Sequence, residues 1–350
     1  MYNPFSSIFN KFSHDIGIDL GTANTLIYVR GRGIAIKEPS VVAINKRTKE
    51  ILAIGEEARR MVGRTPAHIV AVRPLVDGVI SDFEITEQML RYFFDRVHRE
   101  RFSIIPRPRV VIGIPHSVTE VERRAVEEGA INAGAREVYL IEEPIAAAIG
   151  ARLPIQDASG NMIVDIGGGT TEVAVMSLGG VVASRSLRIA GDEMNDEIIQ
   201  YARDKFNLLL GVRTAEEIKM NIGSAIEMKD KLEAPMRGRD LVSGLPKEII
   251  VSDAQIREAM KKSLNSIMES IRVTMEETPP ELLADIMDKG IILAGGGALL
   301  LGLDRRIAQE TQTQVHIADD PLTAVVRGTG IVLEDLDMLS SILLPREVRR

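Results

Sequence analysis

Two stretches of this 350-residue chain share one pattern: residues 15–29 read DIGIDLGTANTLIYV, and residues 162–175 read MIVDIGGGTTEVAV. In each, an apolar run containing β-branched residues leads to an aspartate, a turn of glycine and threonine follows, and a second apolar run begins. This arrangement predicts strand, tight turn, strand, whereas a Rossmann or P-loop glycine cluster would open a helix. We therefore interpret the chain as two related halves, each of which presents one such turn to the same ligand.

The residues of the two turns suit phosphate binding. Glycine lets backbone N–H groups approach an anion closely, and threonine hydroxyls add donors. Asp19 and Asp165, near the turns, would repel phosphate but could hold a hydrated Mg²⁺, which needs only one or two carboxylates. For either copy alone, an ordinary hairpin is the alternative. The repetition of Asp-x-Gly-x-x-x-Thr favours the phosphate site, and its members are Asp19, Gly21 and Thr25 in the first copy and Asp165, Gly167 and Thr171 in the second.

Composition narrows the class of protein. The hydrophobic content of 45% and the charged content of 27% are typical of a soluble globular protein, and the length suits two domains. The net charge of −7 and the aromatic content of 4% argue against nucleic acid as a partner. The absence of cysteine excludes disulfides and thiolate metal sites. No segment reaches the roughly 20 apolar residues that a membrane span needs.

Two segments are nevertheless candidates for contact with a membrane surface. The first has four large apolar side chains at helical spacing, and an interfacial helix is one interpretation; they are Phe5, Ile8, Phe9 and Phe12. A frayed terminus or a helix packed on the body is the other. The second is a loop at residues 99–109, in which arginines flank Phe102, Ile104 and Ile105. Burial of this loop against a neighbouring helix is the alternative.

The remaining pattern alternates strands with helices, which predicts an α/β protein. Apolar runs indicate strands within 34–44, 50–54, 110–114, 138–141 and 249–251, the last in an otherwise turn-rich segment, 235–251. Helices are expected at 57–63, at 86–98, after a cap at 117 or 119 to about 132, opening at 142–144, at 191–209, within 214–228, and from 253 to a stop at Pro279-Pro280. A capping box is expected from Ser117 or Thr119 with Glu120 or Glu122.

A third glycine cluster lies at residues 290–300, which read GIILAGGGALL. It predicts a strand, a glycine turn and a helix from about Leu300 to Glu310, so that backbone amides would face an anion or a nucleotide edge. After two phosphate-type hairpins, it suits a third wall of a nucleotide site. Near the end of the chain, residues 326–330 read VRGTG, which indicates a close crossing of two helices.

These motifs resemble the actin-like ATPase superfamily, whose signature is two phosphate loops, an adenosine loop and two connecting helices. The matching segments are 19–25, 165–171, 295–298, 142–150 and 325–330. Within the superfamily the chain is most similar to the MreB family of bacterial actin homologues. The residues that carry this similarity are DLGTANT at 19–25, IEEP at 141–144, DIGGGTTEV at 165–173 and TPPEL at 278–282.

The resemblance implies an α/β, actin-like ATPase fold. Two related ribonuclease-H-like halves with smaller inserted subdomains would surround a nucleotide cleft that holds ATP and Mg²⁺. The implied subdomains are 1–42 with 78–157 and 325–350; 43–77; 158–193 with 261–324; and 194–260.

The resemblance also assigns site residues. Glu143 and Thr170 would position the attacking water, since phosphoryl transfer to water needs an oriented nucleophile more than a strong base. For Glu143, beside Glu142, the alternative is a carboxylate at a helix N-terminus. The phosphates would lie between Gly21, Thr22, Ala23 and Asn24 and the opposite set Gly167, Gly168, Gly169 and Thr170. The adenosine would meet Glu216, Glu217, Ile218 and Lys219 on one side and Gly295, Gly296, Gly297, Ala298 and Leu299 on the other.

The implied function is that of a cytoskeletal ATPase. It would form paired, membrane-associated filaments that direct cell-wall growth and maintain rod shape, in the cytoplasm on the inner face of the cell membrane. Its implied partners are further copies of itself, that membrane, and membrane-anchored shape and cell-wall synthesis proteins. The alternative is a soluble small-molecule kinase, which would need a second substrate pocket. A chaperone ATPase would be expected to continue into a peptide-binding domain, and a DNA-segregating actin is disfavoured by the apolar amino terminus.

Overall fold

The computed structural model describes residues 14–98 and 107–345. The chain divides into two compact units: unit 1 comprises residues 1–156 and 323–350, and unit 2 comprises residues 157–322. Each unit has its own hydrophobic core. Among the described residues, no helix is both long enough and apolar enough to cross a membrane.

Unit 1 is built on a five-stranded sheet in the order β10-β9-β1-β2-β3. Strands β1, β9 and β10 run parallel, while β1, β2 and β3 form an antiparallel meander. The strands are β1 (Ile16–Leu20), β2 (Asn24–Val29), β3 (Gly33–Pro39), β9 (Arg109–Ile114) and β10 (Glu137–Glu142). The first hairpin is thereby confirmed, and its buried strands supply much of the core.

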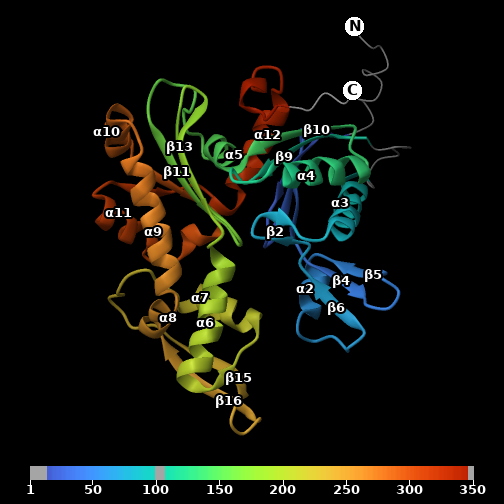
Figure 1. The fold of residues 1–350 in the computed structure, drawn as a ribbon, viewed down its shortest axis with the longest axis vertical. Helices are drawn as coiled ribbons and strands as arrows, with labels where there is room; N and C mark the ends of the chain where they lie inside the picture. The colour runs from blue at the N-terminus through green and yellow to red at the C-terminus, as the bar shows by residue number, and fades with distance from the viewer. Residues whose placement is uncertain (1–13, 99–106, 346–350) are drawn as a thin grey trace. The chain divides into compact units, whose positions relative to one another are not determined.

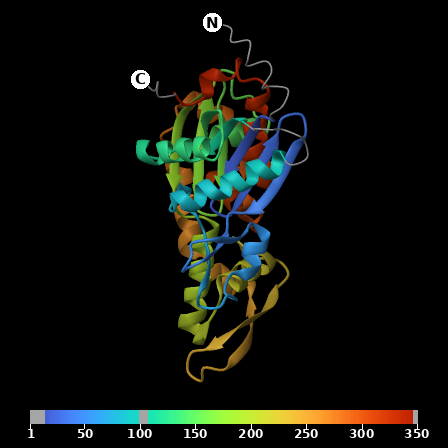
Figure 2. The same ribbon diagram turned by 90° about the vertical axis from the view of Figure 1, so that its right-hand side faces the viewer.

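Helices and two smaller sheets complete unit 1. Helix α3 packs on α4, and the two run side by side in Figures 1 and 2. The helices are α2 (Glu56–Met61), α3 (Phe83–His98), α4 (Glu120–Asn132), α5 (Glu143–Gly150) and α12 (Ala324–Glu334), with a 3-10 turn at Ser340–Ile342. One small sheet joins β4 (Val42–Asn45), β5 (Ile51–Ile54) and β6 (Ile69–Val72), and the other joins β7 (Leu75–Val76) and β8 (Val79–Ile80). Thr119 caps α4 and forms the expected capping box with Glu122.

Helices α5 and α12 cross at backbone contact, which confirms the predicted small-residue crossing. A Cβ atom added to Gly328 would overlap the carbonyl oxygen of Ala146, and one added to Gly150 would overlap that of Ala324. Only glycine fits at these two positions, because the obstructing atoms belong to the backbone and cannot turn away.

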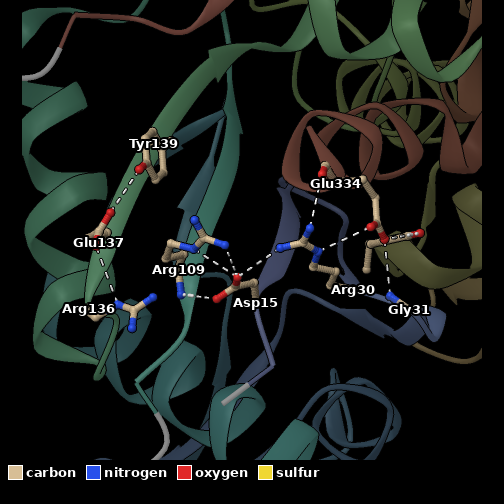
Figure 3. Close-up of polar contacts among 9 residues, drawn as sticks. Asp15, Arg30, Gly31, Arg109, Arg136, Glu137, Tyr139 and Glu334 are labelled. Carbon is tan, nitrogen blue, oxygen red and sulfur yellow. Dashed lines mark hydrogen bonds and ion pairs between the residues drawn. The ribbon is translucent and has the colours of Figure 1, made fainter. Parts of the chain in front are cut away.

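A buried carboxylate fastens the start of β1 to its neighbours (Figure 3). Asp15 accepts hydrogen bonds from the backbone N–H of Arg109 at 3.0 Å and from its guanidinium at 2.6 and 3.0 Å. Arg30 lies 3.7 Å from the same carboxylate, and it also donates to Glu334 at the end of α12. This network therefore joins the first strand, the parallel strand beside it and the last helix of unit 1.

Unit 2 repeats the topology of the main sheet of unit 1. Its order is β13-β12-β11-β17-β18, with an antiparallel meander followed by two parallel strands. The strands are β11 (Asn161–Ile166), β12 (Thr171–Ser177), β13 (Gly180–Leu187), β17 (Ile291–Ala294) and β18 (Val315–Ile317). The second hairpin is thereby confirmed, and it occupies the place in its sheet that the first hairpin has in unit 1.

The rest of unit 2 differs from the sequence expectation in several places. The expected helix at 191–209 is α6 (Gly191–Phe206), which ends because Asn207 adopts the left-handed conformation that asparagine tolerates. Residues 208 and 209 form β14 (Leu208–Leu209), and the helix within 214–228 is α7 (Val212–Ile222). The turn-rich segment is a hairpin of β15 (Glu233–Asp240) and β16 (Pro246–Ser252), shown beside α6 in Figure 1.

The expected long helix is also interrupted. It consists of α8 (Asp253–Ala259) and α9 (Lys261–Glu276), because Glu197 of α6 accepts the free N–H of Ser263 and so caps the start of α9. The two prolines that stop α9 also begin a further helix, α10 (Pro280–Lys289), as proline favours a first turn. After the third glycine cluster the structure has a 3-10 turn, η1 (Gly296–Leu299), before α11 (Leu303–Thr311), so the helix begins three residues later than expected.

Candidate functional site

The parallel strands of unit 1 bring two carboxylates to one edge of its sheet. Asp19 of β1 pairs in register with Gly113 of β9, which in turn pairs with Ile141 of β10. Glu143 follows two residues later, as the first residue of α5. Residues at the carboxyl ends of parallel strands form the binding sites of open α/β sheets. Asp19 and Glu143 therefore lie where such a site is expected.

The two adjacent glutamates have different surroundings. Glu142 binds His116, with 2.8 Å between Oε2 and Nδ1. Glu143 is 8% exposed. A Cβ atom added to Gly113 would lie 3.0 Å from Cγ1 of Val325 and 3.4 Å from Cγ of Glu143. Glu142 is therefore held by a side chain of unit 1, whereas Glu143 is buried beside Gly113 and Val325.

The first turn is held by hydrogen bonds from a buried serine, Ser40, that sequence reasoning missed. The Ser40 hydroxyl donates to the carbonyl oxygen of Gly21 at 2.6 Å and lies 2.9 Å from the Thr25 hydroxyl. The N–H of Ser40 donates to Ala23 at 3.0 Å. Thr22 is also fixed, because its hydroxyl accepts the N–H of Gly78 at 2.9 Å. No motif marks Ser40, which becomes significant only when β3 pairs with β2.

The second turn lies against the start of α6 within unit 2. Its own closure is a hydrogen bond from the N–H of Gly167 to the carbonyl of Thr170 at 2.9 Å. The first two N–H groups of α6, from Gly191 and Asp192, donate to Gly167 and Gly168 at 3.2 and 2.8 Å. Thr170 is 8% exposed and Gly169 is buried. The turn is therefore held in a fixed conformation by the helix that follows it.

Lys219 connects the second turn to the predicted adenosine residues. Its ammonium donates to the carbonyl of Gly191 at 2.6 Å, on the residue that itself bonds the turn. The second turn and α7 are thus joined through Gly191.

Asp165 is a buried carboxylate without a partner among the described residues. It is 6% exposed, and burial raises its pKa to about 7. Gly295, at φ 77°, leaves room for it, because a Cβ atom there would overlap an oxygen of the Asp165 carboxylate. A buried carboxylate with free oxygens fits a divalent cation such as Mg²⁺, which would compensate its charge. In the described ranges, no group of three or more acidic or histidine side chains offers a complete metal site.

The two predicted adenosine segments are neighbours in unit 2, but their residues differ in exposure. Leu299 is 54% exposed, Glu217 pairs with Arg213 at 2.9 Å, and Glu216 is half-buried. Ile218 and Ala298, by contrast, have buried side chains in the core of unit 2. A role for either in binding would therefore fall to its backbone. The helical spacing of Ala215, Ile218 and Ile222, all apolar and buried, is the signal that places Ile218 inside.

The predicted membrane residues cannot be placed. Those of the amino terminus, at residues 5–12, and those of the loop, at residues 102–105, lie outside the described residues. Their role stays a prediction.

Comparison with known proteins identifies the family. A sequence profile described as MreB/Mbl protein matches residues 13–341. The chain belongs to the MreB/Mbl family. Among MreB/Mbl relatives, it is 51% identical to the cell shape-determining protein Mbl of Bacillus cereus over 328 residues, which covers 94% of this chain and 98% of the relative. It is also 51% identical to the cell shape-determining protein MreB of Escherichia coli over 340 residues, covering 96% and 98%.

Solved structures show the same MreB/Mbl relationship and the actin-like fold. MreB5 of Spiroplasma citri bound to ADP matches with a TM-score of 0.88 at 39% identity, covering 94% of this chain and 98% of that one. The AMPPNP-bound form of MreB5 matches with a TM-score of 0.89. MamK, solved as a double helical filament, matches with a TM-score of 0.79 at 23% identity, which bears on the fold alone. The expected fold class and family are confirmed.

Proposed function

We propose that this member of the MreB/Mbl family is an ATP-hydrolysing cytoskeletal protein that forms paired filaments on the inner face of the cell membrane and directs cell-wall growth. The observation that carries the nucleotide part is a set of three features of unit 2: the Asp165 carboxylate, buried without a partner in the described part of the chain, the fixed turn at 167–170, and Lys219, which bonds the same residue as that turn. The related MreB5 of Spiroplasma citri, solved with ADP and with AMPPNP, supports it.

In the proposed reaction, water attacks the terminal phosphorus of ATP and the bond to the bridging oxygen breaks, giving ADP and phosphate. The protein contributes mainly orientation and charge stabilisation. Glu143 accepts a hydrogen bond from the attacking water, and Thr170 fixes its position. The turns at 21–24 and 167–170 hold the phosphates. Asp19 and Asp165 are the residues that would hold a hydrated Mg²⁺, whose chemistry when bound would be to neutralise charge on phosphate oxygens.

The test of the nucleotide part compares two neighbouring variants. Glu143→Ala should bind ATP with little change but release phosphate about 10²-fold more slowly, the usual scale for a positioned acid–base group. Glu142→Ala is the matched control, because it removes an adjacent carboxylate whose partner is His116. It should retain most of the activity. Equal activity of Glu143→Ala and the wild type would overturn the assignment of Glu143.

The filament and membrane parts of the proposal rest on the family. The relatives in Bacillus cereus and Escherichia coli are named for cell shape, and growth of a rod-shaped wall needs an element longer than one molecule. A head-to-tail interface that does not close on itself produces such filaments. The proposed contacts with lipid are the apolar residues of the amino terminus and of the loop: Phe5, Ile8, Phe9, Phe12, Phe102, Ile104 and Ile105. Membrane-anchored shape and cell-wall synthesis proteins are the proposed further partners.

A further inference from the structure

Outside the residues considered so far, one arginine of unit 2 forms three hydrogen bonds at a junction of loops. Nη1 of Arg257, on α8, donates to the Ser224 hydroxyl at 2.9 Å, to the carbonyl of Ile226 at 2.9 Å and to the Asp253 carboxylate at 3.1 Å. Ser224 is fully buried and Asp253 is 4% exposed. Hydrogen bonds that involve a charged group and are shielded from water are among the stronger ones in proteins.

The junction that Arg257 braces joins the two predicted adenosine segments. Residues 223–226 follow the carboxyl end of α7, which carries Glu216 and Lys219. Ser224 forms an isolated parallel bridge with Leu301, and the N–H of Ala225 donates to the Leu301 carbonyl at 2.8 Å. Leu301 follows η1 after one intervening residue. The end of α7 and the end of the glycine turn are therefore tied together at the point that Arg257 contacts.

Two further observations show that this junction is closely packed and that the contacts of Asp253 extend beyond it. A Cβ atom added to Gly223 would lie only 3.1 Å from Cδ1 of Leu300, so the Leu300 side chain packs closely against the backbone at residue 223. The N–H of Asp253 donates to the carbonyl of Leu232 at 2.9 Å, and Asp253 accepts the N–H of Leu232 at 3.4 Å. The Arg257–Asp253 pair thus also holds the chain that leads into β15.

We propose that Arg257 is a positioning residue for adenosine: it fixes the spacing between α7 and the glycine turn at 295–299 without touching the nucleotide. This inference rests on the proposed function, in which α7 and residues 295–299 contact the adenosine part of the nucleotide. The guanidinium is suited to the role, since one charged nitrogen, Nη1, reaches a hydroxyl, a carbonyl and a carboxylate together.

The test measures the affinity of the full chain for two probes, MgADP and Mg-tripolyphosphate, by isothermal titration calorimetry. Arg257→Ala should weaken the affinity for MgADP by about tenfold. An effect of this size is within the range measured for residues that are coupled to a site without contacting its ligand. Tripolyphosphate, which lacks the nucleoside, should bind within about twofold of the wild type, on the reasoning that residues far from the junction hold the phosphates. Arg257→Lys keeps a charged nitrogen with several N–H donors, so it should recover part of the affinity for MgADP that Arg257→Ala loses.

Two further variants separate positioning from folding. Ser224→Ala removes one acceptor of Arg257 and leaves the arginine in place, so it should shift MgADP affinity in the same direction by a smaller factor. Arg272→Ala is the control, because Arg272 is an exposed residue of α9 whose ion pairs are with its own helix. It should leave both affinities unchanged.

Two results would overturn the inference. The first is an equal loss of affinity for both probes. The second is a lowered melting temperature with the affinity for MgADP unchanged in Arg257→Ala and Ser224→Ala. A wild-type chain that binds neither probe would instead contradict the proposed function itself, so the two failures can be distinguished.

Discussion

Replacement of Ser40 by alanine tests whether the hydrogen bonds of Ser40 hold the first turn in place. The substitution removes the hydroxyl that donates to Gly21 at 2.6 Å and lies 2.9 Å from the Thr25 hydroxyl. Ser40 and Thr25 are both fully buried, so water cannot readily replace the lost contacts. A buried group left without its hydrogen bond costs about 1–3 kcal/mol. Because the Thr25 hydroxyl can reorient in part, we expect the free energy of unfolding of unit 1 to fall by about 2–3 kcal/mol.

The assay is urea denaturation followed by circular dichroism, together with calorimetric titration of MgATP. The affinity for ATP should fall as well, because the Ser40 hydroxyl would no longer hold the Gly21 carbonyl and, with it, the first turn. Ser81→Ala is the control within unit 1, since Ser81 is exposed and its hydroxyl contacts backbone carbonyls at 3.1 and 3.3 Å. It should change stability by less than about 0.5 kcal/mol. If Ser40→Ala matches Ser81→Ala in stability, the reasoning about the buried brace is wrong; if only stability falls, Ser40 has no part in nucleotide binding.

Three other perturbations have defined outcomes. The pKa of Asp165 is raised by burial to about 7; since the folded state keeps a proton that the unfolded state releases near pH 4, stability is lost as pH rises to about 7. The free energy of unfolding of the ligand-free chain should therefore fall by about 1.4 kcal/mol between pH 6 and pH 8 because of this group. Denaturation at both pH values should show that Asp165→Asn lacks this part of the fall. Gly328→Ala should destabilise unit 1 by about 2–3 kcal/mol because the new methyl group overlaps the Ala146 carbonyl. Gly129→Ala, a glycine within α4 whose Cβ would lie 3.7 Å from Phe83, should instead stabilise it by up to about 1 kcal/mol, and similar losses in both variants would refute the close-crossing argument. Deletion of residues 1–13 should weaken pelleting with anionic liposomes while phosphate release persists, and undiminished pelleting would show that this stretch is not the main anchor.

The elements that sequence predicted well are those specified by neighbouring residues. The two hairpins follow from apolar runs on either side of glycine turns, and α4 follows from the capping box of Thr119 and Glu122. A close helix crossing at residues 326–330 was predicted from small residues alone, and the structure shows that the partner of α12 there is α5.

The elements that sequence missed depend on contacts with distant residues. Strand β15 contains Pro235 and Gly238, which disfavour a strand locally. It forms because β16 pairs with it, and because Gly238 permits the close approach of the Leu209 carbonyl. The break between α8 and α9 was not visible, because the apolar spacing continues across it while the cap comes from Glu197 of α6.

The candidate site shows the same limit. Asp19, Asp165 and the glycine turns could be proposed from sequence because phosphate and metal binding need those residue types at that spacing. Ser40 and Arg257 were not found, since each acts through backbone carbonyls that only the fold brings within reach. The resemblance to the actin-like family supplied Glu143, and the structure adds the reason to separate it from Glu142: His116 holds the latter.

The most direct test of the account is co-sedimentation of the full chain with anionic liposomes in the presence of MgATP, of MgADP and of no nucleotide, with the pellets viewed by negative-stain microscopy. We predict pelleting that depends on ATP, with paired filaments on the lipid surface. A chain that stays monomeric in the supernatant under all three conditions would contradict the proposal of a nucleotide-dependent, membrane-associated filament.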